Sequence, residues 1–221
     1  RRGSTASERS LAVGVLAETV AVLDCRCCRR FAGRLLPALA ESARDGDPEV
    51  RGNAVYGLGV LAHGARDVLA PHLPLLLGLL STALSSEENR RVLDNACGAL
   101  ARIITSASPS LLVPVEQVFP AMLQALPLVE DLEENTAVFT CVTQLYQATG
   151  LTQVLQNLGP VLRAVGHVLG TTQITEAVES SLRVMVLDLA QRHPAEFHAA
   201  LSTLPAHSAC RLHADAAAAL S

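Results

Sequence analysis

The hydrophobic residues of this chain form successive runs with helical spacing, and short polar breaks separate the runs. Apolar positions that recur every three or four residues place their side chains on one face of an α-helix. The pattern therefore predicts an all-α protein. The predicted helices lie near residues 7–23, 30–44, 48–64, 71–84, 90–106, 114–126, 132–148, 153–169, 173–192, 195–203 and 206–219.

Four of the predicted helices share a proline at or near their start. Each proline stands one or two residues before a leucine or methionine, and a second helical run follows each proline-containing run after a polar turn. Proline costs least early in a helix, so these runs remain helical. The prolines are Pro37, Pro74, Pro120 and Pro160, and their spacings are 37, 46 and 40 residues. This regular spacing indicates an internal repeat.

The second runs also match one another, at an offset of 42 residues. Small residues at the matched positions allow helices to approach closely. The turn before the first of these runs carries a capping signal, because Asp47 can cap the helix and Pro48 suits its first position. The matched pairs are Val50/Val92, Asn53/Asn95, Ala54/Ala96 and Leu58/Leu100.

The repeat resembles the HEAT repeat, which joins a proline-containing first helix to an Ala-rich second helix through an Asp-Pro-x-Val-Arg turn. Here that turn is Asp47-Pro48-Glu49-Val50-Arg51. The resemblance implies an α-solenoid, a right-handed superhelix of antiparallel helix pairs with about five repeats. The chain opens with a second-type helix, so residues 8–221 are predicted to be the carboxy-terminal fragment of a longer solenoid, after a disordered end at residues 1–7. An ordinary helical bundle is the alternative.

The composition fits stacked helices better than a sandwich or barrel. Half of the residues are apolar but only 3% are aromatic, with no tryptophan, and sheet proteins favour aromatic and β-branched residues. All 17 basic residues are arginine, and the net charge is −4. A mildly acidic chain with few aromatic rings is a poor candidate for nucleic-acid binding. An acidic chain can still have basic partners.

The cysteines are unevenly placed and do not form the regular framework of a secreted disulfide domain. Cys25, Cys27 and Cys28 are the best metal candidates, but no distant pair of ligands completes the four that structural zinc needs. We therefore predict free thiols in a loop between helices and no metal. The sequence contains no zinc-protease motif, phosphate-binding loop or nucleophile elbow. Neither enzymatic activity nor a cofactor is predicted.

Two segments bear on membranes and targeting. Residues 68–86 carry no acidic or basic side chain, but they contain Pro71, Pro74 and Gly78 and belong to the repeat. We interpret this stretch as a buried helix rather than a membrane span. No apolar region follows the opening residues Arg1 and Arg2, so no signal peptide is predicted.

Acidic residues concentrate in one third of the repeat array. Residues 85–135 carry three arginines and eight acidic residues, a net charge of −5. Most of these acids flank the starts of two second-type helices, where they can form a shared strip for a basic ligand. Acids at helix starts also compensate the helix dipole, and repeated asparagines also form ladders within a solenoid, so both alternatives stay open. The candidate binding residues are Asp94, Asn95, Glu130, Asp131, Glu133, Glu134, Asn53, Glu87 and Glu88.

Several strings in order are similar to the carboxy-terminal region of the importin-β (karyopherin) family. They are ERSLAVGVLAETV from Glu8, DPEVRGNAVYGLGVLA from Asp47, DNACGALARII from Asp94 and ALPLVEDLEE from Ala125. Two positions depart from what we expect of that family. The segment Cys25–Arg30 is richer in arginine and cysteine, and Asn135 stands where we expect an aromatic residue.

This resemblance implies a nuclear import receptor that acts as a monomer and shuttles between cytoplasm and nucleus. Such a receptor binds nuclear localisation signals and other basic cargo on its concave surface. Core histones, delivered with a histone chaperone, and ribosomal proteins are the cargo that the resemblance implies. Ran-GTP contacts in the family lie mainly in the amino-terminal arch, which is not part of this chain. No membrane or nucleic-acid partner is implied.

Two alternatives belong to other functional classes. One is a HEAT-repeat structural scaffold whose acidic side chains face a folded protein partner. The other is an accessory domain of an enzyme. Binding of a short basic peptide favours the carrier, whereas a requirement for a folded domain favours the scaffold.

Overall fold

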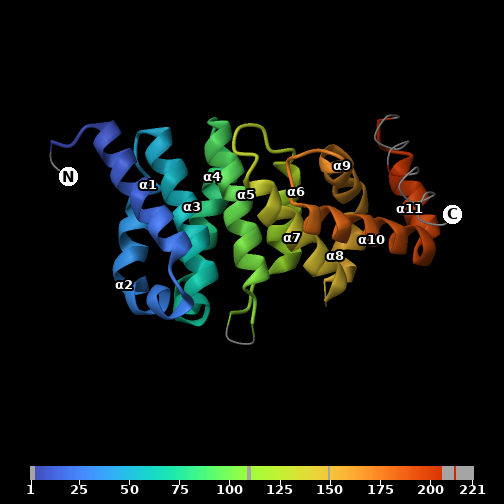
Figure 1. Cartoon of the computed structure of the whole chain (residues 1–221), viewed down its shortest axis with the longest axis horizontal. Helices are drawn as coiled ribbons and strands as arrows, with labels where there is room; N and C mark the ends of the chain where they lie inside the picture. Colours follow the sequence, from blue (N-terminus) through green and yellow to red (C-terminus); the bar gives the residue numbers. More distant parts are fainter. Residues whose placement is uncertain (1–2, 109–110, 149, 206–211, 213–221) are drawn as a thin grey trace. The chain divides into compact units, whose positions relative to one another are not determined.

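The structure is a computed structural model that describes residues 3–108, 111–148, 150–205 and 212. Within these residues the chain is helical and has no β-strand (Figure 1). The elements are α1 (Ala6–Val22), α2 (Cys25–Ser42), α3 (Pro48–Ala65), the 3-10 helix η1 (Arg66–His72), α4 (Leu73–Ser86), α5 (Arg90–Thr105), α6 (Val115–Gln124), α7 (Glu134–Gln147), α8 (Leu151–Gln156), α9 (Leu158–Val168), α10 (Glu176–Arg192) and α11 (Pro194–Leu201). The predicted all-α class and its HEAT-type helix pairs are confirmed.

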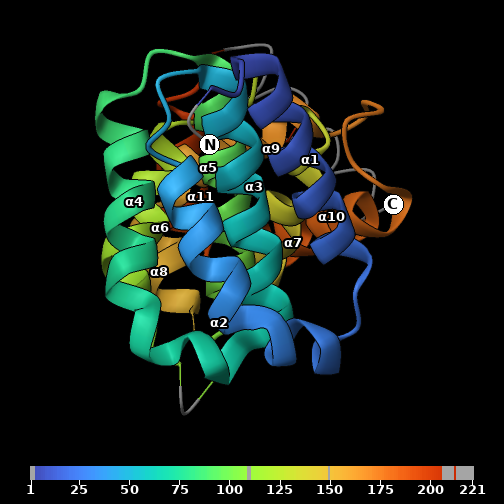
Figure 2. The same cartoon turned by 90° about the vertical axis from the view of Figure 1, so that its left-hand side faces the viewer.

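The first of two compact units comprises Arg1–Pro114 and Leu128–Glu134. In this unit α3 packs against α1, α2 and α5, and α4 packs against α5. The second-type helices α1, α3 and α5 therefore form one layer, and α2 and α4 lie outside it (Figure 2). A side-chain carbon added at Gly59 would lie only 2.6 Å from the Cα atom of Ala99, so α3 and α5 meet backbone to backbone.

Side-chain caps fix where the helices of this unit begin. The Asp47 carboxylate accepts hydrogen bonds from the backbone N–H groups of Glu49 and Val50, at 3.0 and 3.1 Å. Asp24 caps α2 and Asn89 caps α5 in the same way. These caps satisfy N–H groups that have no partner inside the helix.

The second unit comprises Val115–Pro127 and Asn135–Ser221. In it α9 packs against α6, α8 and α11, and α10 packs against α11. Two side-chain contacts link α7 to the residues of the next repeat. Asn135 Nδ2 donates to Gln173 Oε1 at 3.2 Å, and the Tyr146 hydroxyl donates to the carboxylate of Asp188.

Two predicted helix boundaries are corrected by the structure. The helix α2 begins at Cys25 rather than near residue 30, because Asp24 accepts a hydrogen bond from the backbone N–H of Cys27 at 2.7 Å. The cysteine cluster thus forms the first turn of a helix and is not a loop. The single helix predicted at 153–169 is two helices, α8 and α9, which separate at Asn157. Pro160 explains the break, since it has no N–H and its ring would clash with the carbonyl of Gln156 in a continuous helix.

The amino-terminal end of the array differs from the predicted one, and the predicted carboxy-terminal helix can be compared at a single residue only. Within the segment predicted as a disordered end, Thr5 caps α1 and Ala6 is the first residue of that helix. The helix predicted at 206–219 lies outside the described residues except for Leu212, which is buried.

We expect α1 to be the least stable helix of the first unit. Leu11, Val15 and Val22 on this helix are 70%, 58% and 83% exposed, so burial stabilises α1 on one side only. In native-state hydrogen exchange, the amides of α1 should exchange faster than those of α3 and α5. Protection of α1 equal to that of α3 would contradict this expectation.

Candidate functional site

Paired side chains connect consecutive repeats at the starts of the second-type helices. Arg9 donates to both carboxylate oxygens of Asp45 at 2.7 and 2.8 Å, and Arg51 donates to both oxygens of Glu87 at 2.7 and 2.9 Å. In each pair the acid stands 36 residues after the arginine. The hydrogen bond from Arg9 lowers the pKa of Asp45 to about 2, and Arg51 lowers the pKa of Glu87. Glu87, a predicted binding residue, therefore joins two repeats.

Asp131 forms a weaker connection of the same kind. Its Oδ2 atom lies 3.7 Å from Nε of Arg91 and accepts a hydrogen bond from Asn95 Nδ2 at 3.3 Å. The Arg91 side chain is 57% exposed, so solvent screens this ion pair strongly. Asp131 is half-buried and serves the connection between α5 and the loop before α7.

The repeated asparagines are also engaged within the repeat array. Asn53 Nδ2 donates to the backbone carbonyl and the hydroxyl of Ser10, at 3.1 and 3.2 Å. Asn95 Nδ2 donates to the backbone carbonyl of Arg91 at 3.0 Å and to Asp131. Of the two alternatives that the sequence leaves open, these contacts favour a ladder within the solenoid over contacts with a peptide backbone.

Asp94 is fully buried and holds the loop that precedes α7. Its Oδ2 atom accepts hydrogen bonds from the backbone N–H groups of Val129, Glu130 and Asp131, at 3.0, 2.7 and 2.9 Å. Its Oδ1 atom is buried without a hydrogen-bond partner among the described residues. We expected Asp94 to face a basic ligand, and the structure corrects this expectation because the carboxylate has no exposed surface.

Glu134 is the second acid that was expected at the surface and is buried in the structure. It is 3% exposed, and both of its oxygens accept hydrogen bonds from the guanidinium of Arg102. Burial raises the pKa of Glu134, and the hydrogen bonds from Arg102 oppose that rise. The same guanidinium lies 5.3 Å from the ring centre of Tyr56. A side-chain carbon added at Gly98 would lie 1.3 Å from the carboxylate, so glycine leaves the room that Glu134 occupies.

Three of the nine predicted residues remain exposed and form no ion pair among the described residues: Glu88, Glu130 and Glu133. Two of them lie in the loop that Asp94 holds. Val129 and Leu132 in that loop are 54% and 37% exposed. The loop therefore presents two free carboxylates and two apolar side chains from a backbone that is fixed by a buried acceptor. We call residues 129–133 the acidic loop.

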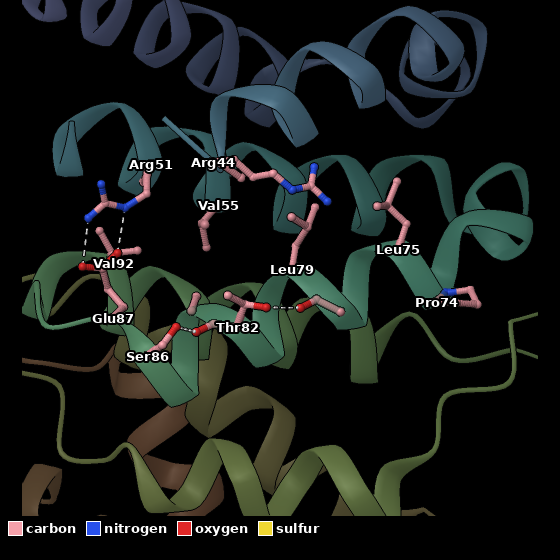
Figure 3. Close-up of a pocket in the computed structure, with 13 residues that line it drawn as sticks. Arg44, Arg51, Val55, Pro74, Leu75, Leu79, Thr82, Ser86, Glu87 and Val92 are labelled. Carbon is pink, nitrogen blue, oxygen red and sulfur yellow. Dashed lines mark hydrogen bonds and ion pairs between the residues drawn. The ribbon is translucent and has the colours of Figure 1, made fainter. Parts of the chain in front are cut away.

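A groove of about 440 Å³ lies in the first unit, along α4 (Figure 3). Leu75, Leu79 and Val55 line it with apolar surface, and the Arg51–Glu87 pair stands at its edge. The hydroxyls of Thr82 and Ser86 in its wall donate to carbonyls of their own helix. Since its polar groups already bond to one another or to the backbone, this groove offers packing surface rather than chemistry.

The helices also include one stretch of membrane-like composition. Pro48–Ser86, which contains α3, η1 and α4, is long and apolar enough to cross a membrane by length and composition alone. Core helices of globular proteins pass the same test. The stretch is interrupted at Arg66, where φ is +33°, and Leu61 and Leu80 on either side of the break are fully buried. Only 28% of its most apolar 18-residue window is buried, so packing within the unit covers part of this stretch and the predicted buried helix at 68–86 is only partly buried.

Cysteines differ in their access to solvent. Cys25 is exposed, Cys27 is intermediate in exposure, and Cys28, Cys97 and Cys141 are buried. Burial raises the pKa of the last two thiols to about 12. Within the described part of the chain, no three His, Cys, Asp or Glu side chains come together closely enough to hold a metal ion.

This arrangement predicts an order of thiol reactivity in the folded protein. During brief alkylation followed by mass spectrometry, Cys25 should react first, and Cys97 and Cys141 should react only after addition of urea, because the thiolate is the reactive form. A chelator should leave the circular dichroism spectrum unchanged. Stoichiometric zinc in the purified protein, or early reaction at Cys97, would contradict these expectations.

The comparisons with known proteins agree with the repeat architecture. The HEAT-like repeat family model matches residues 48–103. Importin-4 of Homo sapiens is 42% identical over 214 residues, and importin-4 of Mus musculus is 38% identical over the same length; the match covers 97% of this chain and 19% of each relative. The probable importin subunit beta-4 of Schizosaccharomyces pombe is 28% identical over 189 residues, 85% of this chain and 17% of that protein. The chain thus spans less than a fifth of the length of these relatives, and it belongs to the importin-β (karyopherin) family as a HEAT-repeat region.

Proposed function

We propose that this region binds basic cargo for a nuclear import receptor through the acidic loop and Glu88. The observation that carries the proposal is the exposure of Glu88, Glu130 and Glu133, the acids that the ion-pair ladder leaves free. The relatives are named importins. The cargo that fits is a Lys/Arg-rich disordered segment, as in core histones delivered with their chaperone or in ribosomal proteins.

The free carboxylates act together rather than as single strong contacts. An exposed ion pair contributes about 0–1 kcal/mol, so several are needed for useful affinity. Charge attracts the basic segment from a distance, and local contacts then set its register. Val129 and Leu132 add apolar contact between the acids. Binding should therefore weaken steeply with salt, since the Debye length is about 8 Å at physiological ionic strength.

In the cell, this region works within a monomeric receptor that shuttles between cytoplasm and nucleus. Ran-GTP acts on other parts of such a receptor, so this chain alone holds cargo without a release switch. Cargo binding requires no catalytic group.

The expected result of neutralising the acidic loop is a loss of affinity without unfolding. The double change Glu130→Gln and Glu133→Gln removes two exposed charges and should weaken binding of a labelled core-histone tail peptide about fivefold. Fluorescence anisotropy at low and physiological salt measures the effect, and the difference between the proteins should shrink at the higher salt.

A matched control uses exposed acids of the second unit. Glu176→Gln with Glu196→Gln makes the same change in net charge, and both side chains are exposed. Glu179 is unsuitable because it pairs with Arg183 at 2.7 Å. If the control variant loses affinity while the acidic-loop variant binds like the parent protein, the site is wrong. If no protein binds the tail but all bind a folded basic domain, the scaffold alternative replaces the carrier.

A further inference from the structure

The helix α2 carries a row of exposed arginines that the cargo proposal does not use. Arg26, Arg30 and Arg34 follow one another at intervals of four residues, so they lie on one face of the helix. Arg29 stands beside this row, and all four side chains are exposed. In Figure 2, α2 lies at the front, with α3 behind it. We call these four residues the α2 arginine row.

The α2 arginine row has no counter-charge in the part of the chain that the structure describes. No carboxylate lies within 4 Å of any of its guanidiniums, although Arg9, Arg51 and Arg102 on other helices all form ion pairs. Residues 25–42 carry four arginines and one acid, Glu41, whereas the whole chain has a net charge of −4. A local excess of positive charge thus stands on an acidic protein.

This placement opposes the stability of the helix. Like charges four residues apart repel one another, and positive charges near a helix start oppose the helix dipole. Arg26, Arg29 and Arg30 lie within the first two turns of α2. Arginines that serve only as a solvated surface have no reason to gather there, so the row is better explained by a ligand that supplies the missing negative charge.

The surface around the row is open to a protein chain. A side-chain carbon at Gly33, between Arg30 and Arg34, would meet nothing within 4 Å. Phe31 beside the row is 38% exposed, and the guanidinium of Arg30 lies 5.6 Å from its ring centre. A partner segment can therefore approach the helix backbone between the arginines and place an apolar side chain against Phe31.

We propose that the α2 arginine row binds an acidic, Asp/Glu-rich segment of a partner protein. Each planar guanidinium matches a carboxylate through two parallel hydrogen bonds. Nucleic acid fits less well, since binding of nucleic acid favours several aromatic rings for base stacking and the row has one neighbouring ring, Phe31. The α2 arginine row is separate from the acidic loop and of opposite charge. A negative result for binding of an acidic segment would therefore leave the cargo proposal unaffected.

The test compares two neutralised proteins with the parent. Arg30→Gln with Arg34→Gln removes two charges from the row, and Arg66→Gln with Arg163→Gln removes two exposed charges elsewhere. The probe is a fluorescein-labelled Glu-rich peptide that contains one phenylalanine, measured by anisotropy at low salt. The row variant should bind roughly tenfold more weakly, and the control should bind within twofold of the parent. The melting temperature of the row variant should equal or exceed that of the parent, because repulsion within α2 is reduced.

Two further measurements distinguish recognition of carboxylates through paired hydrogen bonds from general electrostatic attraction. Arg30→Lys with Arg34→Lys keeps the charge but loses the paired hydrogen bonds, so the peptide should bind more weakly than to the parent. A single-stranded oligonucleotide of equal charge is the competing ligand. Equal binding of the peptide to the row variant and the control overturns the proposal. Tighter binding of the oligonucleotide than of the peptide, lost in the row variant, also overturns it and assigns the surface to nucleic acid.

Discussion

Replacing Arg102 with leucine (Arg102→Leu) should lower the free energy of unfolding by about 3–5 kcal/mol, because it leaves the carboxylate of Glu134 buried without a partner. The Glu134 side chain is only 4% exposed and Arg102 is 19% exposed, so water cannot replace the lost hydrogen bonds. Urea denaturation followed by circular dichroism measures the change. The double change Arg102→Leu with Glu134→Leu should recover most of the loss, since no buried charge remains.

The loss of stability in Arg102→Leu should depend on pH. Burial raises the pKa of Glu134 above the ordinary value of 4.5 for a glutamate, and loss of Arg102 removes the contact that opposes this rise. The folded variant then binds a proton at a higher pH than the unfolded chain does. Its loss of stability relative to the parent should be greatest at neutral pH and should shrink as the pH falls toward 4.5.

An exposed ion pair provides the control for this effect. Arg183 pairs with Glu179 four residues earlier on α10, and its side chain is 43% exposed. Arg183→Leu should change the free energy of unfolding by less than about 1 kcal/mol. Equal losses for Arg102→Leu and Arg183→Leu would show that the buried pair contributes no more to the free energy of unfolding than the exposed pair does.

The sequence predicts most of this fold because its signals are local. Helical spacing and capping residues such as Asp47 act within a few residues, so the helices α1, α3 and α5 fall within one or two residues of their predicted bounds. The missed break at Asn157 is also local, but a proline alone does not predict a break, since Pro37 lies inside the continuous helix α2. The cysteine cluster was misplaced because Asp24 was not recognised as a cap.

The site was harder to predict because its contacts join residues more than thirty positions apart. Glu133 and Glu134 are neighbours in sequence, yet one is exposed and the other is buried. Helical spacing on α7 indicates which of the two glutamates is buried. The buried residues Val138 and Val142 lie four and eight positions after Glu134, on the same face. No comparable signal identified Arg102 as its partner, because only the packing of α5 brings the two together.

Replacing Asp94 with alanine (Asp94→Ala) should cost about 3 kcal/mol of stability, because the backbone N–H groups of Val129, Glu130 and Asp131 lose their shared acceptor. The acidic loop should then become mobile, and the basic peptide should lose affinity although Glu130 and Glu133 are unchanged. Asp94→Asn keeps an oxygen that can accept the same bonds, so it should lose less of both. Urea denaturation and hydrogen exchange at residues 129–131 measure the change. Unaltered exchange at these three amides in Asp94→Ala would mean that Asp94 does not hold the loop, and the rigid presentation of its two free carboxylates would need another cause.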